Sequence, residues 1–248
     1  MTTKKDQAQA MLSAIETGNT DAILANVSPT KYIQHNLQFG NGRDAILASI
    51  PELQAYHPQL EFLRIIEDGD YVAVHTHYTF SDQPVTGFDI FRFENGKIVE
   101  HWDNLEAVTG ATPSKHTAFD GPQQLTAAAV TTATKQLASA FQTDILINHQ
   151  LDKLPQYVSS TLISHLPELA DGAIAYTDFL NDTGNYQTAH LTVVENDFAL
   201  LTSSGNENGQ DVVYYDLIRT ADNRIVELWR AKEIVLPVDQ QANTNGKF

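Results

Sequence analysis

The chain has 248 residues, 42% of them hydrophobic and 19% charged, a composition that suits a globular protein of one large or two modest domains. Its 31 acidic and 15 basic residues give a formal charge of −16, which argues against binding to nucleic acid or to an anionic membrane surface. The absence of cysteine excludes disulfides, thiolate metal sites and cysteine nucleophiles.

The N-terminal segment has Asp6, Gln7 and Gln9 where a secretory signal would have its apolar core. No stretch of the sequence approaches the roughly 20 consecutive apolar residues of a membrane helix. We therefore expect a cytoplasmic protein that does not contact a membrane.

The first half of the chain has helical patterns first and strand patterns after them. Apolar residues cluster at 11–15 and 23–27, on either side of Gly18. Strands are predicted at residues 60–66, 71–80, 87–93 and 97–105, with turns at 67–70 and 94–96. Helices followed by antiparallel hairpins indicate an α+β domain.

The second half repeats this order. An Ala- and Thr-rich helical stretch covers residues 125–147, and a further apolar cluster covers 151–158. Strands are predicted at residues 189–194, 198–204, 211–219 and 224–235, with a turn at 221–223. We therefore expect two α+β domains in tandem.

A direct comparison supports duplication. Residues 71–108 and 198–235 align without gaps at an offset of 127, with ten of 38 positions identical, where chance would give about two or three. The identical pairs are Gln83/Gln210, Val85/Val212, Asp89/Asp216, Arg92/Arg219, Ile98/Ile225, Val99/Val226, Glu100/Glu227, Trp102/Trp229, Glu106/Glu233 and Val108/Val235. Solenoid repeats are shorter, at about 20–50 residues. The predicted domains are residues 1–112 and 125–248, joined by a Gly- and Pro-containing linker at 113–124.

Two segments carry a family resemblance. Residues 32–36 read YIQHN, and residues 89–103 read DIFRFENGKIVEHWD. With the helix pair and the histidine-bearing strand, they resemble the SnoaL-like polyketide cyclases of the nuclear transport factor 2-like superfamily, most closely over residues 8–108. The resemblance implies tandem cone-shaped barrels, each a curved antiparallel sheet wrapped on N-terminal helices with a pocket in its mouth.

The resemblance also implies roles for two residues. Asp89 would act as the acid/base of an aldol closure, and His75, fourteen residues earlier, would hold the substrate enolate. No cofactor and no metal are implied. Single-domain members commonly pair through the open face of the sheet, so we expect a monomer in which the two linked domains form a pseudo-dimer.

The strand pattern itself also draws attention to Asp89. Alternation places Asp89 on one face with Phe91 and Phe93, and an unpaired carboxylate is costly in apolar surroundings. Burial would raise its pKa toward the working range of a general base. The alternative is a structural ion pair of Asp89 with Arg92 or with a histidine.

Histidines and aromatic residues accumulate in the first half. We expect the ligand to contact His35, Tyr32, His77, Phe91, His101, Trp102 and Asp103. A metal site at His35, His75 and His77, completed by His101 or Asp103, is an open alternative.

The second half keeps Asp216 but loses most of these side chains. Thr202, Ser204, Leu228 and Arg230 occupy the positions of His75, His77, His101 and Asp103. An aspartate without imidazole partners is a poor acid/base group, so we expect the second domain to be degenerate.

These features predict acid/base cyclisation or isomerisation of a small apolar carbonyl compound, with Asp89 as the base and His75 as its oxyanion partner. The alternatives are a non-catalytic small-molecule binding protein and, third, a metal enzyme at the histidines.

Overall fold

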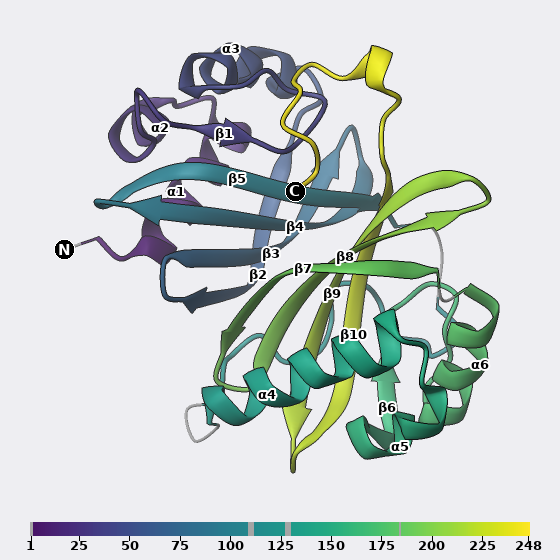
Figure 1. Ribbon diagram of the computed structural model, residues 1–248. Helices are drawn as coiled ribbons and strands as arrows, with labels where there is room; N and C mark the ends of the chain where they lie inside the picture. The colour runs from purple at the N-terminus through teal and green to yellow at the C-terminus, as the bar shows by residue number, and fades with distance from the viewer. Residues whose placement is uncertain (1, 109–111, 127–129, 184) are drawn as a thin grey trace. The chain divides into compact units, whose positions relative to one another are not determined.

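The computed structural model describes residues 2–108, 112–126, 130–183 and 185–248 (Figure 1). The chain forms two compact units, one of residues 1–107 with 235–248 and one of residues 108–234. The sequence-based division treats 113–124 as a linker and 235–248 as part of the second domain. In the structure the former segment groups with the second unit and the latter with the first.

The first unit begins with helices and ends with four long strands. Its elements are α1 (Lys4–Thr17), α2 (Asp21–Asn26), β1 (Ile33–Gln34), α3 (Arg43–Gln54), β2 (Gln59–Asp68), β3 (Tyr71–Phe80), β4 (Gln83–Glu94) and β5 (Lys97–Ala107). Helix α1 starts at a capping box formed by Thr3 and Asp6, and it ends at Gly18, whose φ of 71° suits a glycine.

The strands form one sheet in the order β1-β5-β4-β3-β2, antiparallel except for the short parallel edge β1–β5. The helices pack on one face of this sheet. The core between them contains Ala8, Met11, Leu12, Ala14, Ile23, Val27, Tyr32, Ile46, Ile50, Val72, Val74, Phe91, Phe93 and Ile98. The predicted α+β fold is confirmed, with the parallel edge as an addition.

Two features of the hairpins decide which side chains share a face. The β3–β4 turn consists of Ser81 and Asp82, both at positive φ, and its register sets Val74 opposite Asp89. Between β4 and β5, a bulge next to Arg92 shifts the register by one residue. The shift sets Asp89 opposite Asp103, so both lie on the helix-covered face.

The second unit has the same order of elements. They are α4 (Thr131–Phe141), the π-helical turn η1 (Gln142–Ile147), the 3₁₀ turn η2 (Leu151–Lys153), α5 (Leu154–Tyr157), β6 (Val158–Ser164), α6 (Ala173–Thr183), β7 (Tyr186–Glu195), β8 (Phe198–Glu207), β9 (Gln210–Ala221) and β10 (Arg224–Ile234). Its sheet order is β6-β10-β9-β8-β7, with β6 parallel to β10. Residues 127–129 of the predicted helical stretch lie outside the described residues.

The duplication extends to fine detail. Strands β7–β10 each begin 127 residues after their counterparts β2–β5. The bulge recurs between Ile225 and Glu227, and it sets Asp216 opposite Arg230 as the first bulge sets Asp89 opposite Asp103. The predicted tandem architecture is confirmed.

A C-terminal segment completes the first unit. It contains the 3₁₀ turn η3 (Val238–Gln240) and contacts His35, which follows β1. The Nδ1 atom of His35 lies 2.9 Å from the carbonyl oxygen of Gly246, and its Nε2 lies 3.0 Å from Glu100. The ring stacks on Trp102 at a centroid distance of 4.8 Å.

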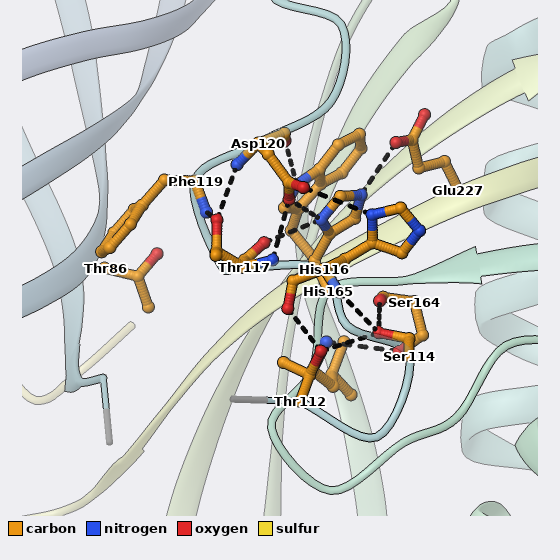
Figure 2. A network of polar contacts seen from close by, with 12 residues as sticks. Thr86, Thr112, Ser114, His116, Thr117, Phe119, Asp120, Ser164, His165 and Glu227 are labelled. Atoms are coloured by element: carbon orange, nitrogen blue, oxygen red, sulfur yellow. Dashed lines mark hydrogen bonds and ion pairs between the residues drawn. The ribbon is translucent and has the colours of Figure 1, made fainter. Parts of the chain in front are cut away.

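Residues 112–120 complete the second unit in the same way. His165 Nδ1 lies 2.8 Å from the carbonyl oxygen of Thr117, and its Nε2 lies 2.8 Å from Glu227 (Figure 2). The ring stacks on Trp229 at 4.4 Å. Each unit therefore contains the segment that follows the last strand of the other.

Within the described ranges, no helix combines the length and the apolar character needed to cross a membrane.

Candidate active site

Asp89 is the centre of a buried polar cluster in the first unit. Its side chain comes from the middle of β4 and the residue is 3% exposed. The Tyr78 hydroxyl donates to Oδ2 at 2.6 Å, and His101 Nε2 lies 3.1 Å from Oδ1. Both carboxylate oxygens are thus held by groups that can carry a proton.

The protonation of His101 follows from its other neighbour. Gln34 Oε1 accepts the backbone N–H of Asn36 at 2.9 Å and lies 3.0 Å from His101 Nδ1, so Nδ1 carries a hydrogen. The contact between His101 Nε2 and Asp89 then contains one proton, which either atom can hold. The geometry makes Asp89 and His101 a proton-sharing pair.

Burial raises the pKa of Asp89 from its ordinary value of 3.8, and the nearby charge of Asp103 raises it further. The hydrogen bonds from His101 and Tyr78 oppose this shift only in part. The same environment raises the pKa of Tyr78 well above 10.0, chiefly through burial and then through Asp89. Tyr78 therefore stays a hydrogen-bond donor at neutral pH.

Asp103 lies beside this pair and has a cationic neighbour. Its Oδ2 accepts from the Asn36 side-chain amide at 2.7 Å. Lys247, from the C-terminal segment, places Nζ 2.8 Å from the Asp103 carbonyl oxygen and 3.9 Å from Oδ1. Both residues are buried, so the ammonium group offsets the charge of a carboxylate that water does not solvate.

The position of Tyr78 depends on Gly87 across the β3–β4 pair. A Cβ atom at residue 87 would lie 2.5 Å from Cε2 of the Tyr78 ring and 2.8 Å from Cδ2. The glycine leaves the space through which the tyrosine reaches Asp89.

We expect Gly87→Ala to destabilise the first unit by about 1–3 kcal/mol, because a buried ring has to move aside for the new methyl group. Chemical unfolding would measure the loss. In a Tyr78→Ala background the same substitution should cost almost nothing more. A full additional loss in that background would contradict the steric explanation.

Four of the residues that were predicted to contact the ligand lie on the same side of the sheet as Asp89. Phe91, His101 and Asp103 lie on its face of the sheet by register, and His101 stacks on Phe91 at 4.7 Å. Tyr32 is buried in the same core. Burial is the main cause that raises the pKa of its hydroxyl, and the charges of Asp103 and Asp89 add to the increase.

The predicted pairing of Asp89 with His75 is wrong. His75 is opposite Phe88 in the register, so its side chain lies on the other face of the sheet. There Arg64 Nη1 donates to His75 Nδ1 at 3.0 Å, and His75 Nε2 donates to Thr86 at 3.0 Å. The imidazole that reaches Asp89 is His101.

Three other expected ligand contacts also lie away from Asp89. His77 lies on the same face of the sheet as His75, and its Nδ1 is 3.6 Å from Glu61 Oε2. His35 and Trp102 stack on each other, with Trp102 opposite Ile90 on that same face. The expected structural pair of Asp89 with Arg92 is also wrong, because Arg92 bonds Glu94 and Glu100.

The structure does not gather the metal site expected at His35, His75 and His77. Among the described residues, two clusters offer three ligand atoms within 4.8 Å of one another, and neither includes these histidines. One cluster is Asp89, His101 and Asp103. Its oxygens already face Tyr78, Asn36 and the ammonium group of Lys247, which favours proton chemistry over a cation.

The equivalent place in the second unit has different chemistry. Asp216 accepts from the Tyr186 hydroxyl at 3.1 Å, and Arg230 faces it across the strand pair. Leu228 stands where the first unit has His101. A guanidinium is permanently charged and cannot relay a proton at neutral pH.

Four residues of the first cluster were not among those expected: Tyr78, Gln34, Asn36 and Lys247. The two-residue turn at Ser81 and Asp82 could have fixed the β3–β4 register and with it the face of Tyr78. Residues 34 and 36 lie in the YIQHN segment, which shows no helix or strand periodicity from which the direction of their side chains could be predicted. No sequence pattern points to Lys247.

Helices on one face of a strongly paired sheet, with an acid and a histidine buried between them, define a cone-type α+β domain with a polar pair in its core. Residues 8–101, which lie in the first unit, match the family described as the SnoaL-like domain. The resemblance seen in the sequence is confirmed for these residues, and the second unit repeats the fold.

Solved structures from several bacteria are similar over about two-fifths of the chain. A candidate polyketide cyclase from Bacillus cereus is 20% identical, covering 41% of this chain and 72% of its own, with a TM-score of 0.37. A candidate ketosteroid isomerase from Kribbella flavida is 15% identical over 45% and 85%, with a TM-score of 0.41. An NTF2-like protein from Cytophaga hutchinsonii is 12% identical over 43% and 92%, with a TM-score of 0.36. No curated protein matches the chain.

Proposed function

We propose that the first unit catalyses proton transfer next to the carbonyl group of a small apolar compound, in a cyclisation or an isomerisation. The observation that carries this proposal is the buried Asp89–His101 pair, in which Oδ1 and Nε2 lie 3.1 Å apart. A SnoaL-like domain at residues 8–101 supports this class of chemistry.

Each member of the cluster has a distinct role in the proposed reaction. Asp89 in its carboxylate form takes the proton from the carbon next to the carbonyl, because its raised pKa makes it a stronger base than an exposed aspartate. Tyr78 and His101, which donate to Asp89 in this structure, turn to the developing enolate oxygen. In an isomerisation Asp89 then returns the proton to a second carbon. In a cyclisation the enolate carbon attacks a second carbonyl, and the alkoxide oxygen formed there takes the proton from Asp89.

Two further residues position these groups. Gln34 holds the Nδ1 side of His101 and so keeps Nε2 directed at the reacting atoms. Phe91 stacks on the imidazole of His101 and, with Val74, supplies the apolar surroundings that exclude water from Asp89. The apolar walls favour an apolar substrate over a sugar or a nucleotide.

We expect the protein to exchange the α-hydrogens of a suitable ketone for deuterium, which NMR in D₂O detects without knowledge of the product. A panel of cyclic ketones, 1,3-diketones and β-keto esters would sample the substrate class. The rate should rise with pH through an apparent pKa above 3.8, because burial favours the protonated form of Asp89 and only the carboxylate is a base. A compound that binds in the first unit without any exchange would instead indicate a binding protein.

A further inference from the structure

A second cluster of ligand-type side chains lies in the second unit. His116 and Asp120 belong to the segment that follows the first unit's last strand, and His165 follows β6. Figure 2 shows both imidazoles directed at the Asp120 carboxylate. His116 Nδ1 is 3.3 Å from Oδ2, and His165 Nδ1 is 2.8 Å from Oδ1.

Both ring nitrogens of His165 face oxygen atoms. The ring has the Glu227 carboxylate 2.8 Å from Nε2. It has the Thr117 carbonyl oxygen and Asp120 Oδ1 each 2.8 Å from Nδ1. A ring that donates from Nε2 to the Glu227 carboxylate has Nδ1 free to bind a metal ion beside Asp120 and the Thr117 carbonyl oxygen.

We propose that His116, Asp120 and His165 bind one divalent transition-metal ion, with Zn²⁺ as the reference ion. Tetrahedral zinc bonds of about 2.0–2.2 Å to nitrogen and oxygen place neighbouring ligand atoms about 3.3–3.6 Å apart. His116 Nδ1 and Asp120 Oδ2 are 3.3 Å apart, and one ligand atom from each of the three residues lies within 4.8 Å of the others. Two imidazoles and a carboxylate are a donor set for zinc, cobalt or nickel rather than for calcium.

The environment of the cluster suits a metal. Glu227 accepts from the far nitrogen of His165, the outer carboxylate contact that metal-binding histidines usually have. The His165 side chain is fully buried, whereas His116 and Asp120 are 34% and 45% exposed, so an ion can enter from solvent. The Thr117 carbonyl oxygen is a further ligand within reach.

The first unit contains a natural comparison. His35 has the same two contacts, with Glu100 and with the carbonyl oxygen of Gly246. The residue before Gly246 is Asn245, where the other segment has His116 before Thr117, and residues 240–248 contain no Asp or Glu. The surroundings of His35 therefore lack the second imidazole and the carboxylate of the other cluster, and we expect one ion per chain.

Untagged full-length protein, freed of metal by a chelator, would be titrated with Zn²⁺ by calorimetry and with Co²⁺ by visible absorption. We expect one Zn²⁺ per chain, proton release on binding, and d–d bands for Co²⁺. His116→Ala and Asp120→Asn should each weaken Zn²⁺ binding at least tenfold. His190→Ala, at an exposed histidine of β7, should leave it unchanged.

Circular dichroism would verify that the variants fold, which is expected because His116 and Asp120 are partly exposed. Asp103→Asn serves as a second comparison and should bind Zn²⁺ normally. Absence of stoichiometric binding, or unchanged binding by His116→Ala, would overturn the proposal. Loss of binding in Asp103→Asn alone would place the ion in the first unit and would equally overturn it.

Discussion

Asp89→Asn should lower the rate of α-hydrogen exchange by a factor of about 10²–10⁴, the range that a positioned general base contributes. An amide cannot take up the substrate proton, but it can still accept the Tyr78 hydrogen bond and donate to His101 Nε2. The variant should therefore fold normally. Deuterium incorporation followed by NMR, at substrate concentrations below and above KM, would separate the loss of rate from a loss of binding.

Asp216→Asn is the matched control, because residue 216 has the same place in the second unit. Its side chain accepts from the Tyr186 hydroxyl and lies opposite Arg230, and Leu228 stands at the position of His101. We expect exchange within a few-fold of the parent protein. Equal losses in the two variants would refute the assignment of the chemistry to the first unit.

Arg230→Met should destabilise the second unit by about 3–5 kcal/mol, the cost of leaving a buried charge without its counter-ion. Arg230 is 6% exposed and Asp216, directly across the strand pair, is 4% exposed. The guanidinium also lies 5.0 Å from the centre of the Phe179 ring. Urea unfolding followed by fluorescence and circular dichroism would measure the change.

The double variant Asp216→Asn/Arg230→Met tests the reason for that loss. It removes both charges, so most of the stability should return. If the double variant is as unstable as Arg230→Met, the packing of the arginine stem, and not the uncompensated Asp216, determines the stability.

The sequence was sufficient for the architecture because strand alternation and the offset of 127 are local, repeated signals. Asp89 stood out for the same reason, as a carboxylate on a face shared with Phe91 and Phe93. The structure shows that it is buried. Its partner was misassigned because alternation within one strand says nothing about which face of the neighbouring strand is adjacent.

Two local irregularities decide that question. The Ser81–Asp82 turn sets the β3–β4 register and keeps His75 on the far face. The bulge beside Arg92 then brings His101 to Phe91 and Asp103 to Asp89. Without that extra residue, His101 would lie on the opposite face. A bulge has no reliable sequence signature, so the true pair could not be found from spacing.

Lys247 was beyond prediction for a different reason. It lies 144 residues from Asp103 in the chain, and no periodicity relates the two. Only the folded chain shows that a late basic residue offsets the charge of an early buried carboxylate.

The exchange of segments between the units has a consequence for synthesis on the ribosome. Residues 1–107 emerge first, but Gly246 and Lys247 emerge only after the whole of the second unit. At about 5–20 residues per second, the delay is on the order of ten seconds. Throughout that interval His35 and Asp103 lack their late partners. The unit that starts the chain is therefore completed after the second one, and any nascent chain halted before residue 246 lacks the contacts of Gly246 and Lys247 with it.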